Sequence, residues 1–198
     1  MSDAYDVTVL GAGIHGAGAA QAAAAMGYRT LVLEKTGIAS GTSSRSSKLI
    51  HGGLRYLEQA EFGLVRECLR ERELLLKLAP DLVQLRRFRI PLYKDTRRRP
   101  WQLHAGLSLY ALLAGLGSHA TYRTLPRREW DKLDGLDTAD LQAVFEYQDG
   151  QTDDAGLTGA VLRSAESLGA ELRMPACFDT ASVMRTASKS VTRQPGGK

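Results

Sequence analysis

The stretch Asp6-Val-Thr-Val-Leu-Gly-Ala-Gly-Ile-His-Gly16 decides the fold. Its first five residues form a short β-branched, apolar run that suits a buried strand, and a Gly-x-Gly-x-x-Gly pattern follows at once. Residues 14–26 are mostly alanine and glycine, a composition that favours a helix lying close to a sheet. The apolar run Thr30–Glu34 predicts a second buried strand. Together these segments predict a strand–helix–strand unit.

The glycines and the residue that ends the second strand predict a dinucleotide site. Gly11 permits a tight turn, Gly13 lets the backbone approach a pyrophosphate, and Gly16 lets the helix pack on the strand. The helix begins near Ile14, where free N–H groups and the positive end of the dipole attract phosphate. Glu34 can accept hydrogen bonds from ribose hydroxyls, and an acidic residue there disfavours a 2′-phosphate. The motif alone does not distinguish NAD from FAD.

A second segment, residues 39–58, reads Ala-Ser-Gly-Thr-Ser-Ser-Arg-Ser-Ser-Lys-Leu-Ile-His-Gly-Gly-Leu-Arg-Tyr-Leu-Glu. It resembles the signature region of FAD-dependent glycerol-3-phosphate dehydrogenases. The resemblance continues through Phe88-Arg-Ile-Pro91 and Phe145-Glu-Tyr147 and covers roughly the first 170 residues. It implies FAD as cofactor and oxidation of sn-glycerol 3-phosphate to dihydroxyacetone phosphate, with electrons passing to a membrane quinone or to oxygen. The alternatives are a non-catalytic FAD-binding fragment and another glycine-oxidase-like flavoenzyme.

The resemblance also implies roles for residues near the substrate. It places Arg55 and Tyr56 at the substrate pocket, where a planar guanidinium would bind the phosphate. The alternative for Arg55 is a surface ion pair. His51 is a candidate general base, and packing beside the flavin is its alternative.

Further residues are expected to bind the cofactor. The hydroxyls and amides of Thr42–Ser44 can hold a pyrophosphate or the ribityl chain, and Gly52–Gly53 lets the backbone lie flat against a flavin ring. Lys48 is expected to be structural or adjacent to the cofactor. No metal site is predicted. The full set of predicted cofactor-binding residues is Gly11, Gly13, Ile14, Gly16, Glu34, Lys35, Thr42, Ser43, Ser44, Lys48, Leu49, His51, Gly52 and Gly53.

The fold class that follows is α/β, with an incomplete Rossmann-like FAD-binding domain and the start of a substrate domain. Helices are expected at 62–79, 101–116 and 154–168, and strands at 88–93 and 143–148. The expected organisation is an FAD-binding unit with the flavin-contact segment (1–79), a partial substrate region (80–145), a return to the FAD domain (146–174) and a disordered tail (175–198). The chain is expected to be part of a longer enzyme and inactive as a dehydrogenase by itself.

Charge and composition bear on partners and location. The net charge is +4, and an arginine-rich segment carries Tyr93 and Trp101 among its charges. A solvated basic loop and contact with anionic lipid headgroups are the main interpretations, and nucleic acid is not expected because no binding motif accompanies the charge. The chain has two distant cysteines, no signal peptide and no long apolar run, which together predict a cytoplasmic protein. Peripheral attachment to the cytoplasmic face of the inner membrane is the alternative location. The charged residues of this segment are Arg86, Arg87, Arg89, Lys94, Arg97, Arg98 and Arg99.

Overall fold

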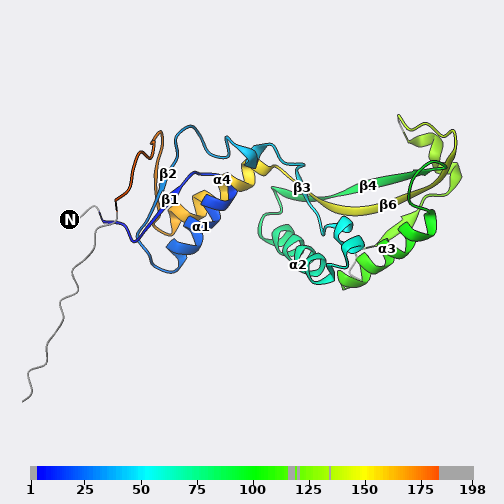
Figure 1. The fold of residues 1–198 in the computed structure, drawn as a ribbon, viewed down its shortest axis with the longest axis horizontal. Coiled ribbons are helices and arrows are strands. Elements are labelled where there is room, and N and C mark those ends of the chain that lie inside the picture. Colours follow the sequence, from blue (N-terminus) through cyan, green and yellow to red (C-terminus); the bar gives the residue numbers. More distant parts are fainter. Residues whose placement is uncertain (1–3, 116–118, 120, 134, 183–198) are drawn as a thin grey trace, which may run out of the picture.

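The computed structural model describes residues 4–115, 119, 121–133 and 135–182. The molecule is elongated, and two units lie end to end along its long axis (Figure 1). The first unit contains a parallel sheet and the second an antiparallel sheet.

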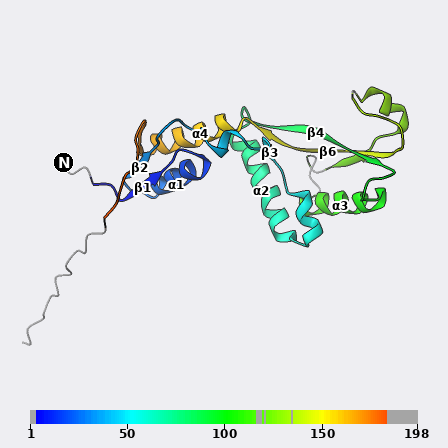
Figure 2. The same cartoon turned by 45° about the horizontal axis from the view of Figure 1, so that its top comes forward.

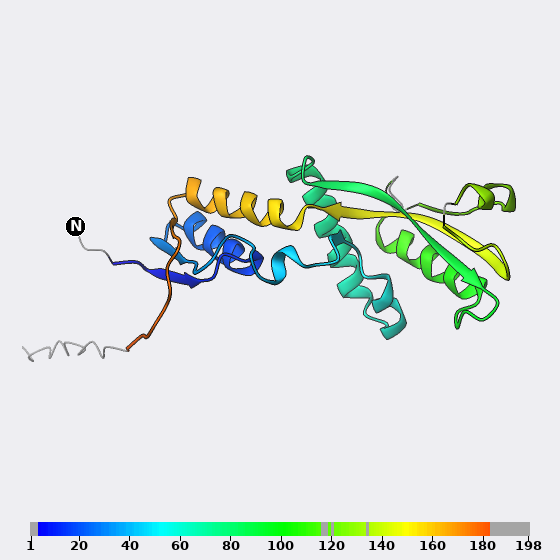
Figure 3. The ribbon, with the colours of Figure 1, turned by 90° about the horizontal axis from the view of Figure 1, so that it is seen from above.

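The parallel sheet is the predicted strand–helix–strand unit with one more strand added. Strands β1 (Val7–Leu10), β2 (Thr30–Leu33) and β7 (Glu171–Arg173) lie in the order β1-β2-β7. Helices α1 (Ile14–Ala25) and α4 (Asp154–Ser167) pack beside each other on one face of it, as Figure 3 shows from above. Strand β2 is buried, as predicted, but β1 is covered only on the helix side, because its alternate residues face outward and Leu10 is 53% exposed.

Small side chains explain how closely α1 approaches its neighbours. Ala17, Ala20 and Ala24 are buried against Val32 of β2 and Leu162 of α4. Alanine favours the helix and leaves little bulk between two helix backbones. Thus the alanine-rich composition that predicts this helix also accounts for its packing.

Asp153 caps α4, since its carboxylate accepts the Gly156 N–H at 3.0 Å. Gly169, with φ +100°, follows the end of the helix.

The antiparallel sheet is built on two long strands, β4 (Val83–Tyr93) and β6 (Leu141–Thr152). On the other edge of β6 lie the short strands β3 (Leu49–Ile50) and β5 (Tyr122–Thr124). Helices α2 (Phe62–Leu78) and α3 (Pro100–Leu113) lie on the same side of the long strands (Figure 2). Short 3₁₀ helices are η1 (Thr42–Ser44), η2 (Leu54–Gln59) and η4 (Arg127–Lys132).

The predicted elements exist, with changed bounds. β4 is an edge strand, a position that tolerates Pro91, and it begins at Val83, whereas β6 runs to Thr152. Helix α2, grouped with the FAD-binding unit in the sequence, packs on β4, η2 and α3 of the second unit. Of the predicted tail, residues 175–182 form no helix or strand, and residues 183–198 lie outside the described part of the chain.

Candidate cofactor-binding site

The turn from β1 into α1 has the geometry that the three glycines predict. Gly11 adopts φ +97°, which a residue with a side chain rarely does. A Cβ on Gly16 would lie 1.9 Å from the Gly11 carbonyl oxygen, so only glycine lets α1 begin this close to the strand. A Cβ on Gly13 would lie 3.0 Å from the Ser43 hydroxyl oxygen and would narrow the space at the helix end.

Two segments predicted to bind phosphate meet at this helix end. The Ile14 N–H donates to the Ser43 hydroxyl at 2.9 Å, which holds η1 against the start of α1. The next two amides, of His15 and Gly16, have no acceptor among the described residues. Free amides at a helix start, beside serine hydroxyls, fit the phosphates of a dinucleotide.

Glu34 lies where the sequence predicts, at the end of β2, and its carboxylate is buried at 7% exposure. One oxygen accepts the Ala12 N–H at 2.7 Å, and the other accepts the Thr36 N–H at 2.8 Å. The Ala12 amide, followed by the Thr36 amide, lowers the pKa of this carboxyl to about 2. Glu34 therefore stays ionised and ties the glycine turn to the loop after β2. The oxygen bound to Ala12 has one described donor and keeps acceptor capacity for a ribose hydroxyl.

Lys48 has the structural role that its sequence context allows. Its ammonium lies 2.5 Å from a carboxylate oxygen of Asp154, the first residue of α4. The other oxygen of Asp154 accepts the Ser46 hydroxyl at 2.9 Å. Lys48, with Ser46, lowers the pKa of Asp154 to about 2. This cluster ties the segment before β3, which begins at Leu49, to helix α4 of the first unit.

The Gly52–Gly53 turn packs against the protein's own side chains. A Cβ on Gly52 would lie 2.5 Å from the Leu69 side chain and 2.6 Å from the Tyr110 hydroxyl oxygen. A Cβ on Gly53, which has φ +69°, would lie 2.3 Å from the Tyr56 ring. Internal packing therefore demands both glycines, a reason that the sequence does not reveal.

His51 is held by the same turn. Its Nδ1 accepts the Gly53 N–H at 2.9 Å. In a neutral ring with this bond, the proton is on Nε2, so the exposed nitrogen is a hydrogen-bond donor. This arrangement suits His51 for orienting a ligand better than for removing a proton.

Arg55 and Tyr56 follow in η2, and both side chains are exposed. Arg55 borders a cleft of about 660 Å³ between η2, β4 and α3, whose other walls are mostly apolar. The ion pair of this 3₁₀ helix is formed by Glu58, which accepts from Arg98 at 2.9 Å. Arg55, the residue predicted to bind the substrate phosphate, thus lies at the edge of a cleft.

Residues 6–180 of the sequence match the profile of the FAD dependent oxidoreductase family. The chain belongs to this family. The chain is similar to a glycerol-3-phosphate dehydrogenase of Synechocystis sp., which is 44% identical over 174 residues that make up 87% of this chain and 32% of that protein. The chain therefore spans about a third of the length of the curated relatives that it matches. The match confirms the predicted fold class, an α/β unit of an FAD-dependent oxidoreductase.

A second relative extends the resemblance. A D-erythritol 1-phosphate dehydrogenase of Brucella abortus is 41% identical over 193 residues, 97% of this chain and 36% of that protein. The sequence predicts a resemblance that ends near residue 170. That prediction concerned the glycerol-3-phosphate dehydrogenases, and the 174-residue match to the Synechocystis relative agrees with it. The match of 193 residues to the Brucella relative also enters the tail.

Solved structures show the same fold. A glycerol-3-phosphate dehydrogenase from Bacillus halodurans complexed with FAD superposes with a TM-score of 0.64 at 24% identity. The match covers 93% of this chain and 29% of the Bacillus protein. A glycerophosphate oxidase from Mycoplasma pneumoniae with FAD bound has a TM-score of 0.63 at 17% identity, covering 87% and 45%.

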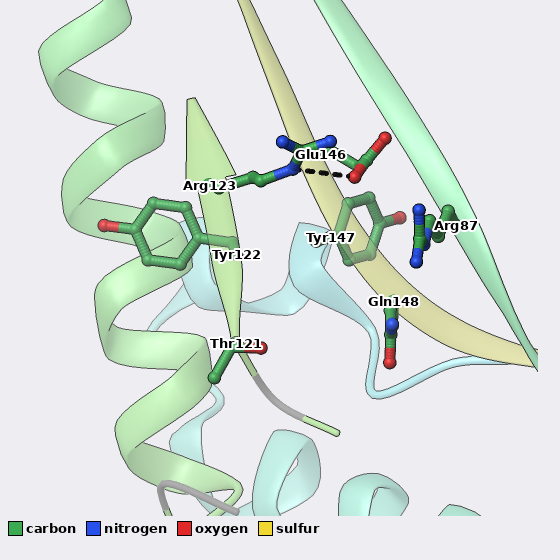
Figure 4. A pocket seen from close by; sticks show the side chains of 7 residues that line it. All are labelled: Arg87, Thr121, Tyr122, Arg123, Glu146, Tyr147 and Gln148. Carbon is green, nitrogen blue, oxygen red and sulfur yellow. Dashed lines mark hydrogen bonds and ion pairs between the residues drawn. The ribbon is translucent and has the colours of Figure 1, made fainter. Parts of the chain in front are cut away.

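The face of the second sheet that points away from α3 carries two ion pairs that the sequence does not predict. Glu146 of β6 accepts from Arg123 of β5 at 3.0 Å and from Arg89 of β4 at 3.1 Å. Figure 4 shows the Arg123 bond beside a hollow of about 390 Å³ that Arg87 also lines. Burial opposes ionisation of Glu146, but Arg123 and Arg89 hold its pKa below the usual value. Arg89 of the arginine-rich segment is thus paired within the second sheet of this protein.

Among residues 4–115, 119, 121–133 and 135–182, no group of acidic, histidine and cysteine side chains is arranged to hold a metal ion. The helices of that same part of the chain are all too short or too polar to cross a membrane.

Proposed function

We propose that the protein binds FAD and takes part in the oxidation of glycerol 3-phosphate to dihydroxyacetone phosphate. The observation that carries the proposal is the meeting of η1, the free amides at the start of α1, and the ionised Glu34 at one site. The amides and the Ser43 hydroxyl would bind the pyrophosphate, and Glu34 the adenosine ribose. FAD, when bound, supplies the acceptor for the hydride of the substrate.

The chain's own residues would bind and orient the substrate. Arg55, at the edge of the cleft, offers a planar fork to the phosphate, and Tyr56 lies next to it in η2. His51 presents its Nε2–H as a donor, because Gly53 occupies Nδ1. These roles make Arg55 the main determinant of affinity for a phosphorylated substrate.

A second substrate is supported by a specific observation. The match to the D-erythritol 1-phosphate dehydrogenase covers more of this chain than the match to the Synechocystis relative does. Both named substrates are polyol phosphates, so an arginine at the phosphate fits either. The pocket that recognises the rest of the polyol decides between them.

The electron acceptor and the location are part of the same proposal. We infer a quinone or oxygen as acceptor and peripheral contact with the cytoplasmic face of the inner membrane. Trp101, at the start of α3, is 71% exposed and is separated from Arg97–Arg99 by Pro100 alone, a grouping that suits anionic headgroups. Vesicles with and without anionic lipid test the contact, with Trp101→Ala as the variant. If the wild-type protein and Trp101→Ala sediment equally with anionic and with neutral vesicles, the membrane contact is refuted.

Flavin binding and turnover need separate experiments. Quenching of flavin fluorescence on titration into the purified protein measures FAD binding directly. For turnover, the chain replaces the matching 174 residues of the Synechocystis relative, and dye reduction is assayed with glycerol 3-phosphate and with D-erythritol 1-phosphate. We expect FAD binding and oxidation of one substrate, with a raised KM in Arg55→Lys and unchanged flavin content. A chimera that binds FAD and oxidises neither substrate would refute the proposed activity.

A further inference from the structure

Three polar side chains form a buried network in the second unit. Arg72 of α2, Tyr110 of α3 and Asp149 of β6 are 0%, 2% and 2% exposed. Their apolar neighbours include Val65 and Leu69. Removing an ion pair from water costs so much that apolar residues of similar shape are often equally stable. Stability alone therefore does not account for charges at this place.

The network ends on a backbone amide of the Gly52–Gly53 turn. The Gly52 N–H donates to the Tyr110 hydroxyl at 2.8 Å, and that hydroxyl donates to Asp149 at 3.0 Å. The other oxygen of Asp149 accepts from Arg72 at 2.9 Å. Because Asp149 receives the hydroxyl proton, a lone pair of Tyr110 is turned toward Gly52.

The same network reaches the strand that leads into the turn. Asp149 also accepts the N–H of Gly150, and Gly150 pairs with Ile50 of β3. The turn is thus fixed by strand pairing before Gly52 and by the Tyr110 hydroxyl at Gly52. Beyond it, the Gly53 carbonyl accepts the Tyr56 N–H at 2.8 Å and starts η2.

We propose that Tyr110, held by Asp149 and Arg72, is a positioning residue that sets the Gly52–Gly53 turn and thereby aims His51 and Arg55 at the ligands. His51 depends on the turn through the Gly53 N–H, and Arg55 through the start of η2. This inference rests on the proposed function, because that function puts the turn on the ligand side of the protein.

Amide exchange tests the structural half without any ligand. Tyr110→Phe keeps the ring and removes the hydroxyl that Gly52 needs. Tyr147→Phe is the matched control, because Tyr147 packs edge-on against Tyr110 and its hydroxyl has no described hydrogen bond. We expect the Gly52 amide to exchange about tenfold faster in Tyr110→Phe and at the wild-type rate in Tyr147→Phe, with β4 and β6 amides unchanged in both.

A second variant separates positioning from general stability. Asp149→Asn leaves the Tyr110 hydroxyl in place but removes the buried one of the two carboxylate charges paired with Arg72, the other being that of Glu73. It should lower the unfolding temperature more than Tyr110→Phe does, yet accelerate Gly52 exchange less. The opposite order, or equal acceleration at all amides in Tyr110→Phe, would overturn the inference.

FAD titration tests the functional half. We expect Tyr110→Phe to raise the dissociation constant of FAD about fivefold to tenfold, and Tyr147→Phe to leave it unchanged. If Tyr110→Phe loses Gly52 protection but binds FAD like the wild type, the positioning role is refuted while the proposed function stands. If the wild-type protein binds no FAD, the proposed function fails, and the exchange data still decide whether Tyr110 holds the turn.

Discussion

The two units of this protein make polar structure in different ways. In the first unit, the dinucleotide site consists mainly of backbone amides, and its buried acid, Glu34, is held by amides and by Thr36. The ion pair of Lys48 with Asp154 lies apart from that site, at the start of α4. In the second unit, charged side chains from different elements pair with each other, as Arg72 does with Asp149 and Glu146 with two arginines. The first arrangement depends on a short sequence motif, whereas the second depends on the tertiary fold.

This difference predicts where single substitutions destabilise most. Asp149→Ala should remove the buried partner of Arg72, which is wholly buried, and leave it only the partly exposed Glu73 as counter-charge. We expect the free energy of unfolding to fall by about 3–5 kcal/mol, measured by urea denaturation. The control is Glu58→Ala, which breaks the solvent-exposed pair with Arg98 and should change the unfolding midpoint far less. Similar losses in the two variants would remove the contrast between buried and exposed pairs.

The first unit should respond to pH through Glu34. Its pKa is about 2 in the folded protein against an ordinary 4.5, so its contribution to stability is complete above pH 4.5 and is lost as the pH falls toward 2. Glu34→Gln should therefore cost about 2–3 kcal/mol at pH 7, and the difference from the wild type should shrink below pH 4.5. Urea midpoints of both proteins at several pH values measure this. A pH-independent difference would show that the amide bonds to Glu34 do not need its charge.

The same contrast explains what the sequence could predict. The glycine turn, α1, β2 and Glu34 lie within 29 residues, and each follows from local backbone requirements, so all were placed correctly. Arg72 and Asp149 are 77 positions apart, and nothing in a charged helix such as α2 marks one arginine as buried. The three-residue strands β5 and β7 also escaped prediction, because their pairing with β6 and β2 creates them.

Two glycines of α1 offer a sharper test of the backbone site. Gly16→Ala would put a Cβ 1.9 Å from the Gly11 carbonyl oxygen, whereas a Cβ on Gly18 meets nothing within 4 Å. We expect Gly16→Ala to destabilise by about 1–3 kcal/mol and to weaken FAD binding, because α1 must move away from the strand. Gly18→Ala should bind FAD normally and gain about 0.5–1 kcal/mol, since alanine favours the helix. FAD titration and urea unfolding of both variants decide the matter.

The smallest losses in stability should come from substitutions on the face of the second sheet that carries Glu146. The losses from its two arginine partners should not be additive. Glu146 is nearly buried but has two partners, whose side chains are 48% exposed for Arg89 and 51% exposed for Arg123. Removing either arginine leaves the carboxylate with the other, so Arg89→Gln and Arg123→Gln should each shift the urea midpoint only slightly.

In the double variant, Glu146 has lost both guanidinium partners while it stays largely out of water, so the loss should exceed the sum of the single losses. Glu146→Gln offers an independent check, because it removes the charge that both arginines pair with. In the Glu146→Gln background, replacing both Arg89 and Arg123 should lower the free energy of unfolding little more than replacing one of them. Strictly additive losses in stability would mean that solvent, and not the two arginines, stabilises the charge of Glu146. The buried charges of the second unit would then be those at Arg72 and Asp149, and the face that carries Glu146 would depend on strand pairing and on the packing of Leu125, Trp130 and Leu133 against Val144.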